Sequence, residues 1–502
     1  MTSAGYADIL RLAAPETVVT VTTLVVLAVD LLALRDLEMR LRRVIAALIA
    51  CAGCLVAMGW ILALPEQGNF AAGMLVVDPL TQLVKVALLV LAILTILLSV
   101  DSDFTPHAGE FVALVLLALL GMMFLAGSED ILMVFISLEL TSLSLYILTA
   151  FDKRNVQSAE AALKYFLFGG MAAAFTLFGL SLLYGLSGST NFSQIAAAIR
   201  GPKLEPVLLL AIVMTLIGFG FKIAAVPFHL WAPDAYQGAP APSAAFIASG
   251  SKVASFFVLA KVMMIGFKGA EGSAAWHGYL AGWMPILAIL AAASMILGNL
   301  TAIVQTSVRR LLAYSAIAHA GYMLLGILPG SGLSLASLIY YVITYGLTTL
   351  GAFGVVSAVQ GTAGGDRLAD FAGLSRRAPV LSFCMMIFML SLAGIPPLAG
   401  FFGKFYLFAE ALHTGPQNLG LLWLVVLALG MSAVSLYYYL MVLKQIYIAE
   451  PAAGTQRPMP VFTQVVLAVV ALAVVVLGCA PDLMVRHLTT AIHLAGFLVA
   501  AH

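Results

Sequence analysis

The chain has 502 residues, of which 63% are hydrophobic and only 9% are charged, and its formal net charge at pH 7 is +1. A typical soluble domain carries about 25% charged residues, so this composition excludes a soluble protein and indicates a polytopic membrane protein. The balanced net charge also gives no sign of nucleic-acid binding.

Apolar runs recur along the whole chain and are separated only by short polar breaks. Runs of about 17 to 25 residues suit a hydrocarbon core of about 30 Å. Counting them predicts an all-α integral membrane protein with fourteen transmembrane helices and no separate globular domain. The predicted ranges are 17–34, 44–63, 79–100, 109–127, 130–150, 159–186, 206–227, 241–267, 279–299, 308–328, 333–360, 379–412, 419–447 and 461–480.

The first apolar run and the last apolar stretch differ from the other runs. The first run is followed by Arg35 and Arg40 rather than by a small-residue cleavage site, so we expect a retained span and not a signal peptide. The stretch 486–502 is apolar but too short to span, and we expect it to lie at the interface or to pack on the bundle.

The distribution of Lys and Arg predicts the orientation in the membrane. Loops on the side of Arg35 hold thirteen of the 24, and loops on the opposite side hold five: Arg11, Arg200, Lys203, Lys268 and Arg486. Cytoplasmic loops carry the excess of these residues. With fourteen spans, both termini are therefore predicted to lie on the outer side.

Two of the predicted helices, the seventh and the twelfth, contain proline breaks. Pro227 frees the carbonyl of Ile223, and Pro396 and Pro397 free the carbonyls of Leu392 and Ala393. Free carbonyls at membrane depth must line a wet or protein-filled cavity, and discontinuous helices at matching places in two halves indicate the ion site of a transporter. The alternative is a pair of proline kinks that serve packing.

The spacing of the breaks predicts an internal repeat. They lie five helices apart, and five is odd, so helices 4–8 and 9–13 are predicted to be related by an inverted repeat. The predicted organisation is a three-helix segment at 1–108, a first five-helix repeat at 109–268, a second at 269–447, and a final transmembrane helix with a tail at 448–502.

Five ionisable residues stand alone inside apolar, helix-length stretches: Glu139, Lys164, Lys222, Lys252 and Lys404. A charge near the bilayer centre costs about 2.5–3.5 kcal/mol on insertion scales. Such residues usually face a polar interior, so this set predicts an ion or proton pathway.

Four other charged residues are interpreted as features of the membrane edge. We expect Lys85 and Lys261 to extend their ammonium groups toward water near the ends of spans. Asp30 and Asp78 lie near predicted span ends, where we expect water to solvate them.

Motifs for redox or metal chemistry are nearly absent from the sequence. The four cysteines, Cys51, Cys54, Cys384 and Cys479, read as small hydrophobic residues without partners. We find no nucleotide-binding glycine loop, haem attachment motif or zinc spacing. We therefore expect this chain to bind no cofactor or metal itself.

Several motifs, in order along the chain, carry a resemblance to a known family. They are FKIAAVPFHLWAPDAY at 221–236, PAP at 240–242, SGSK at 249–252, YSAIAHAGY at 314–322 and PPLAGFFGK at 396–404. Over roughly residues 109–447 the chain resembles the antiporter-like proton-translocating subunits of respiratory complex I. It is most similar to the N type, because it lacks the long lateral helix of the L type and has Lys404 where the M type usually has a glutamate.

This resemblance implies a proton-translocating membrane subunit of NADH:quinone oxidoreductase in the bacterial inner membrane, with periplasmic termini. It implies a translocase subunit without a redox centre, while partner subunits bind NADH, FMN, iron–sulfur clusters and quinone. The implied partners are the other membrane subunits of complex I, including sister antiporter-like subunits. Two alternatives stay open: a subunit of an Mrp-type sodium/proton antiporter, and a structural spacer in which the charges hold helices together.

The resemblance also assigns roles to the first two charges. Glu139 aligns with a glutamate of helix 5 and Lys164 with a lysine of helix 6, and the two are expected to form an ion pair. Opposite charges stabilise each other's ionised forms, so separating the pair lowers the proton affinity of the lysine and ejects a proton. The alternative is a buried pair that only fixes the register of two helices.

Lys222, Lys252 and Lys404 are expected to continue the pathway, each holding and releasing a proton and linked to the next by water. His229 follows Lys222 by about two helical turns and suits a relay because histidine titrates near neutrality; alternatively it bonds a carbonyl freed by the break. His319 is a further possible relay residue, with a hydrogen-bonded core histidine as the alternative.

Overall fold

The computed structural model describes residues 10–63, 67–199, 205–413, 419–450 and 460–496. Its helices are α2 (Ala14–Leu32), α3 (Met39–Ala63), α4 (Pro79–Ser99), α5 (Ala108–Ala126), α6 (Ile131–Thr149), α7 (Val156–Ser187), α8 (Phe192–Ala198), α9 (Pro206–Ile223), α10 (Trp231–Gly238), α11 (Ala241–Ala248), α12 (Gly250–Lys261), α13 (Trp283–Ile303), α14 (Val308–Leu325), α15 (Gly332–Ala363), α16 (Leu374–Arg377), α17 (Pro379–Ala393), α18 (Ala399–Leu412), α19 (Leu422–Tyr447), α20 (Val461–Cys479) and α21 (Asp482–Leu494). Two short strands, β1 (Gly68–Phe70) and β2 (Leu75–Val77), pair antiparallel between α3 and α4.

Local sequence signals explain where many of these helices begin. The side chains of Asp78, Asp130 and Asn155 accept hydrogen bonds from backbone N–H groups in the first turns of α4, α6 and α7, which stabilises a helix N-terminus. Pro206 and Pro379 open α9 and α17, a position where the missing N–H of proline removes no helical bond.

The membrane bundle predicted from the sequence is confirmed. Within the described ranges, twelve helical segments are long and apolar enough to cross a membrane. All fourteen predicted ranges overlap a helix or a pair of helices. Two of them fall outside the twelve: α14, which carries Arg309, Arg310 and His319, and the pair α17–α18, which is interrupted. Fourteen spans therefore stay a prediction.

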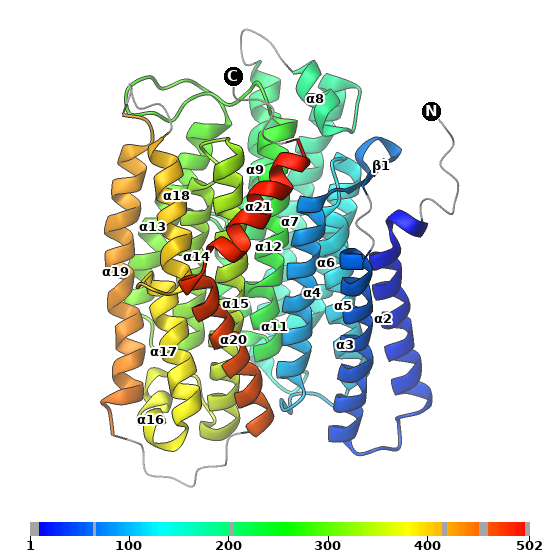
Figure 1. Cartoon of the computed structure of the whole chain (residues 1–502), viewed down its shortest axis with the longest axis vertical. Helices are drawn as coiled ribbons and strands as arrows, with labels where there is room; N and C mark the ends of the chain where they lie inside the picture. The colour runs from blue at the N-terminus through cyan, green and yellow to red at the C-terminus, as the bar shows by residue number, and fades with distance from the viewer. Residues whose placement is uncertain (1–9, 64–66, 200–204, 414–418, 451–459, 497–502) are drawn as a thin grey trace.

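The helices stand side by side along the longest axis of the molecule (Figure 1). The blue helices α2 and α3 lie at one edge and the orange helix α19 at the other, with α11, α12 and α15 between them. These central helices are almost entirely buried, whereas most of α7 and α19 is not. An apolar helix that is buried all round belongs to the core, so α11, α12 and α15 form the centre of the bundle.

Two interruptions share one backbone geometry. Helix α9 ends where Ala224 takes a left-handed conformation with φ 59°, and α17 ends where Gly394 does so with φ 87°. The N–H of Ala225 donates to the Gly220 carbonyl at 2.8 Å, and the N–H of Ile395 donates to the Leu390 carbonyl at 3.0 Å. This is the usual closure of a helix C-terminus, and it leaves irregular backbone beside Lys222 in the first half and Lys404 in the second.

The helix at the C-terminal end packs against the bundle. Helix α21 contacts α4 and α15, and its Leu488, Ala491 and Ile492 are buried. It lies obliquely across the front of the other helices (Figure 1). The prediction that this stretch packs on the bundle is confirmed for residues up to Leu494, and residues 497–502 lie outside the described ranges.

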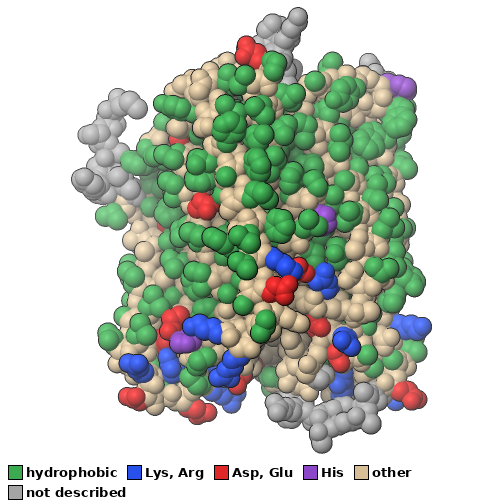
Figure 2. Space-filling model, turned by 180° about the vertical axis from the view of Figure 1, so that it is seen from behind, with side chains coloured by type: hydrophobic (Ala, Val, Ile, Leu, Met, Phe, Trp, Pro, Cys, Tyr) green, Lys and Arg blue, Asp and Glu red, His purple; other side chains and the backbone are tan. Residues whose placement is uncertain are grey.

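The face turned toward the viewer in Figure 2 is mostly apolar, as a surface in contact with lipid requires. Lys, Arg, Asp and Glu side chains gather in its lower half. The orientation of the chain across the membrane remains a prediction from the loop charges.

Candidate functional site

Lys222 lies at the end of α9 and is 5% exposed. Its Nζ donates to Ser142 Oγ of α6 at 2.8 Å. Glu139 lies three residues before Ser142, so both face the same side of α6. Glu139 is partly buried and interacts electrostatically with Lys222.

The predicted ion pair between Glu139 and Lys164 is wrong. The side chain of Lys164 is 41% exposed, and its Nζ pairs with Glu160 at 2.7 Å and with Asp234 at 2.9 Å. Arg310 binds the other oxygen of Asp234 at 2.7 Å. Glu160 precedes Lys164 by one turn on the outward face of α7, an arrangement that favours pairing, so Lys164 pairs with Glu160 and Asp234 instead of Glu139.

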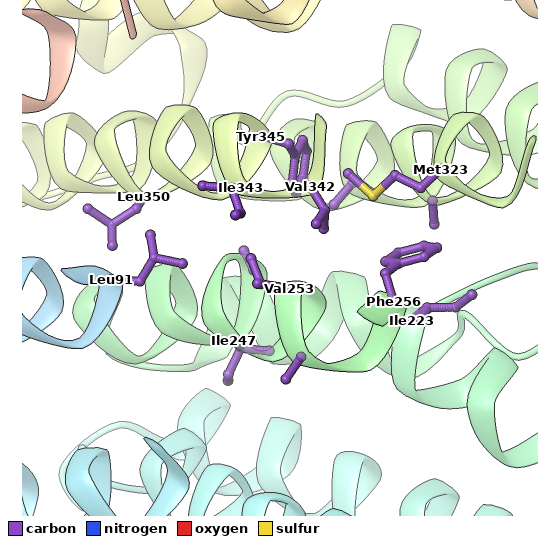
Figure 3. Close-up of a cluster of buried hydrophobic side chains, with 14 of the residues drawn as sticks. Leu91, Ile223, Ile247, Val253, Phe256, Met323, Val342, Ile343, Tyr345 and Leu350 are labelled. Carbon is purple, nitrogen blue, oxygen red and sulfur yellow. The ribbon is translucent and has the colours of Figure 1, made fainter. Parts of the chain in front are cut away.

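Lys252 lies in the central layer of the bundle and is 1% exposed. Its Nζ donates to the carbonyl of Ala316 in α14 and lies 5.5 Å from the centre of the Tyr345 ring. Figure 3 shows Val253 and Phe256 of α12 on the side that faces α15, which carries Val342, Ile343 and Tyr345. The lysine is thus enclosed among apolar side chains, and among the described residues its hydrogen bond goes to one carbonyl.

His319 lies between Lys252 and Lys404 and interacts electrostatically with both. Its Nδ1 is 2.6 Å from the hydroxyl of Tyr341, and its Nε2 is 3.1 Å from the hydroxyl of Tyr439. The rings of His319 and Tyr345 are 5.0 Å apart. Imidazole and phenol both donate and accept hydrogen bonds, so His319, Tyr341 and Tyr439 form a hydrogen-bonded cluster that both lysines influence electrostatically.

Lys404 lies in α18, after the second break, and is 4% exposed. Its Nζ donates to the carbonyls of Leu392 and Ala393 at 3.0 and 3.2 Å, and to Ser432 Oγ at 2.9 Å. These are the two carbonyls that the prolines were predicted to free. Thus the break in the helix supplies the ligands of the lysine.

His229 stands apart from this arrangement. It is buried in the irregular segment between α9 and α10, after Pro227, and its Nδ1 has no hydrogen-bond partner among the described residues. Within the described ranges, no hydrogen bond joins His229 to Lys222, Lys252 or Lys404. Its role as a relay stays a prediction.

Sequence reasoning missed the aromatic partners of the lysines. Tyr341 and Tyr345 lie one turn apart on α15, so they face the same side, and Tyr322 on α14 places its ring 5.0 Å from Lys404 Nζ. The signal that could have found them is the recurrence of hydroxyl-bearing rings at helical spacing within apolar helices.

Three of the expectations for the membrane edge are wrong. Lys85 is fully buried and pairs with Glu16 at 2.6 Å, and Lys261 is fully buried and pairs with Glu129 at 3.0 Å. Asp30 is 1% exposed and binds Arg42. In each case a partner of opposite charge lies on a neighbouring helix or turn, which a search within single spans cannot detect. Asp78, by contrast, lies at a helix end and caps α4.

Within the described ranges no group of three or more His, Cys, Asp or Glu side chains is arranged to hold a metal ion. The four cysteines are free. The candidate site therefore consists of three buried lysines, Lys222, Lys252 and Lys404, whose hydrogen bonds go to hydroxyl and carbonyl oxygens.

Comparisons with known proteins agree with one another. Residues 128–432 match the family model described as NADH:quinone oxidoreductase/Mrp antiporter, TM. The chain is 53% identical over 499 residues to NADH-quinone oxidoreductase subunit N 2 of Acidobacterium capsulatum, covering 97% of this chain and all of that one. It is 40% identical to NADH-quinone oxidoreductase subunit N of Moorella thermoacetica, covering 88% of this chain and 90% of that one.

Solved structures show the same fold. A chain of respiratory complex I from Thermus thermophilus superposes with a TM-score of 0.76 at 35% identity, covering 94% of this chain and 98% of that one. A chain of the Mrp complex from Dietzia sp. gives a TM-score of 0.81 at 19% identity, covering 97% and 99%. At that identity the second likeness concerns the fold alone.

Proposed function

The chain belongs to the NADH:quinone oxidoreductase/Mrp antiporter membrane family, and from this premise we propose that protons cross it by way of Lys222, Lys252, His319 and Lys404. It is a proton-translocating membrane subunit of NADH-quinone oxidoreductase, similar to the N subunits. We assign NADH, FMN, iron–sulfur clusters and quinone to partner subunits, on the similarity to NADH-quinone oxidoreductase subunits N.

One observation carries the proposed pathway: the hydrogen bonds of Lys222, Lys252 and Lys404 go to neutral oxygens. Their partners are Ser142 Oγ, the Ala316 carbonyl, and the Leu392 and Ala393 carbonyls with Ser432 Oγ. In the described ranges none of the three forms an ion pair. Lysine changes its protonation state readily when it is buried, and a lysine without a carboxylate partner loses no ion pair when it does so.

The residues suggest how a proton moves. Lys222 carries the proton beside Ser142, where the charge on Glu139 favours the ammonium form. Lys252 passes its proton toward Lys404 through His319 and the hydroxyls of Tyr341 and Tyr439, with bridging water completing the path. The sequence interpretation had Glu139 act through an ion pair with Lys164. In the pathway proposed here, the charge of Glu139 acts directly on Lys222.

The matching breaks support the predicted repeat. Helices α9 and α17 end with the same backbone closure, and each end lies beside a lysine of the pathway. We propose that residues 109–268 and 269–447 are two inverted units. Sister antiporter-like subunits are the proposed neighbours, and we place the protein in the bacterial inner membrane with both termini on the periplasmic side.

The Mrp-type alternative rests on a weaker likeness, because the solved Mrp structure shares the fold at 19% identity whereas the named NADH-quinone oxidoreductase relatives reach 53%. Purification of the tagged chain separates the two. A pump module co-purifies with flavin and iron–sulfur subunits and with NADH:quinone activity. An antiporter subunit co-purifies with other membrane subunits and no redox partner.

The proposed pathway is tested by Lys222→Ala in the assembled complex. We expect NADH-driven proton pumping into vesicles to be abolished, while Lys153→Ala, at an exposed loop position, pumps like the parent. Normal pumping by a normally assembled Lys222→Ala complex contradicts the pathway.

A further inference from the structure

Two buried carboxylate–lysine pairs lie at the end of the bundle that carries β1 and β2, outside the lysine pathway. Glu16 Oε1 is 2.6 Å from Lys85 Nζ, and Glu129 Oε1 is 3.0 Å from Lys261 Nζ. Neither ammonium group has a hydrogen-bond partner of good geometry among the described residues. Burying an ion pair costs more in desolvation than it returns unless further hydrogen bonds satisfy it, so stability alone does not account for these pairs.

The Glu129 carboxylate projects from a turn that backbone hydrogen bonds hold in place. The N–H of Glu129 donates to the Gly73 carbonyl at 2.8 Å, its carbonyl accepts from the N–H of Phe192 at 2.9 Å, and the Gly127 carbonyl accepts from the N–H of Val76 at 2.6 Å. These bonds fix the point at which the Glu129 side chain leaves the backbone, facing Lys261.

The two pairs differ in their access to water. Both side chains of the Glu16–Lys85 pair are sealed, at 1% and 0% exposed. In the second pair Lys261 is sealed at 0%, but Glu129 is 20% exposed and lines a cavity of about 480 Å³ together with Met264, Lys268, Glu271 and Trp283. This end cavity, defined by those five residues, is lined by the carboxylate but not by Lys261.

Lys261 also occupies a particular place in the chain. It is the last residue of α12, the helix that carries Lys252, and a π-helical turn, Val262–Gly266, follows it directly. Such turns occur frequently at functional sites. Nine residues separate Lys252 from Lys261, so the two point to opposite faces of α12, and Lys261 is a separate site rather than a repeat of Lys252.

We propose that Glu129 and Lys261 form a proton-exchange site between the interior of the bundle and the water of the end cavity. Lys261 passes its proton across the 3.0 Å contact to the Glu129 carboxylate, the carboxylic acid releases it to water, and Lys261 regains a proton from the interior. The reverse sequence takes a proton up. This inference rests on the proposed function, because it supplies the pathway with a connection to one face of the membrane.

The test compares two double variants of the complete complex in sealed vesicles: Glu129→Gln with Lys261→Met, and the matched control Glu16→Gln with Lys85→Met. Each double variant removes both charges of a pair, and replacing a buried ion pair by neutral residues of similar size is often neutral for stability. We expect the rate of NADH-driven proton pumping by the Glu129→Gln, Lys261→Met variant to be at least about tenfold lower than that of the parent. A positioned proton donor contributes roughly 10²–10⁴-fold to a rate. We expect the control to pump like the parent.

Parent-like pumping by both double variants overturns the proposal, since the pairs are then structural; equal slowing of both overturns it as well. If the first double variant pumps normally while Lys222→Ala does not, the exchange site fails and the proposed function stands. Normal pumping by Lys222→Ala is the separate outcome that rejects the proposed function.

A second measurement decides the matter if the double variant does not assemble. Met264→Cys lies in the end cavity, whereas the neighbouring Met263 is fully buried. We expect a membrane-impermeant maleimide to label Met264→Cys, but not Met263→Cys, above the level of the parent cysteines. Absence of labelling at Met264→Cys from both sides of the membrane overturns the proposal.

Discussion

The two broken helices end alike but hold their lysines differently. Lys222 precedes its break and is held by one hydroxyl, Ser142 Oγ, with the charge of Glu139 nearby. Lys404 follows its break and is held by two carbonyls and a hydroxyl, with no ion pair in the described part of the chain. The difference is that a carboxylate lies near the first lysine and acts on it electrostatically, whereas the interruption of α17 itself supplies two ligands of the second.

The largest expected effect comes from His319, the histidine of the proposed pathway. His319→Gln removes the imidazole that the proposed pathway places between Lys252 and Lys404. We expect the rate of NADH-driven proton pumping to fall by roughly 10²-fold, which is the lower end of the range for the loss of a positioned proton carrier. His229→Gln, the matched control in the first half, is expected to pump within about threefold of the parent on the same scale. A larger loss in His229→Gln than in His319→Gln reverses the comparison.

The next effect tests the carboxylate of the first half. Glu139→Gln removes the charge that favours the ammonium form of Lys222 while keeping the shape of the side chain. We expect pumping to fall by about tenfold, which corresponds to about 1.4 kcal/mol. The measurement is pumping at several values of pH, because a change at a proton-binding group alters the pH dependence whereas a change in packing does not. An unaltered pH profile at the parent rate contradicts a role for Glu139.

An effect of similar size separates the ligands of the two lysines. Ser142→Ala removes the only hydrogen bond of Lys222 in the described ranges, whereas Ser432→Ala removes one of three at Lys404. A hydrogen bond to a charged group contributes about 1.5–3 kcal/mol, so we expect roughly tenfold slower pumping in Ser142→Ala. Ser432→Ala is expected to lose less. Equal losses in both would show that the number of ligands does not distinguish the two sites.

The smallest effect concerns the two helix ends. Gly394→Ala places a Cβ in a left-handed conformation and 3.2 Å from Cδ of Lys404, so we expect a destabilisation of about 1–2 kcal/mol, read as a lower melting temperature of the complex. Ala224→Gly relieves the same conformation at the other break and is expected to leave the melting temperature equal or higher. A lower value in Ala224→Gly would contradict this account of the closures.

The bundle and both breaks were predictable because hydropathy and proline positions act within single segments. Lys404 illustrates this: Pro396 and Pro397 free two carbonyls in any membrane helix, and the structure shows both bound by the lysine. The sequence also singled out Lys222, Lys252 and Lys404 correctly as buried charges, since each stands alone within an apolar run.

The partners of these charges were not predictable, because they depend on which helices meet. Lys164 pairs with Asp234 only because α10 folds back beside α7, and Lys261 meets Glu129 only because α12 ends beside the turn after α5. A similar argument applies to Tyr341 of α15 and Tyr439 of α19, whose hydroxyls meet the ring nitrogens of His319 from two separate helices.

The central claim is that buried lysines bind and release the protons, and Lys404→Arg tests it most directly. Arginine keeps the positive charge and can donate to the Leu392 and Ala393 carbonyls, but it does not give up its proton in proteins. We predict that the complex assembles, with its other subunits intact, and that NADH-driven pumping is lost. Pumping at the parent rate would show that a fixed positive charge is sufficient at this position, and would contradict the account.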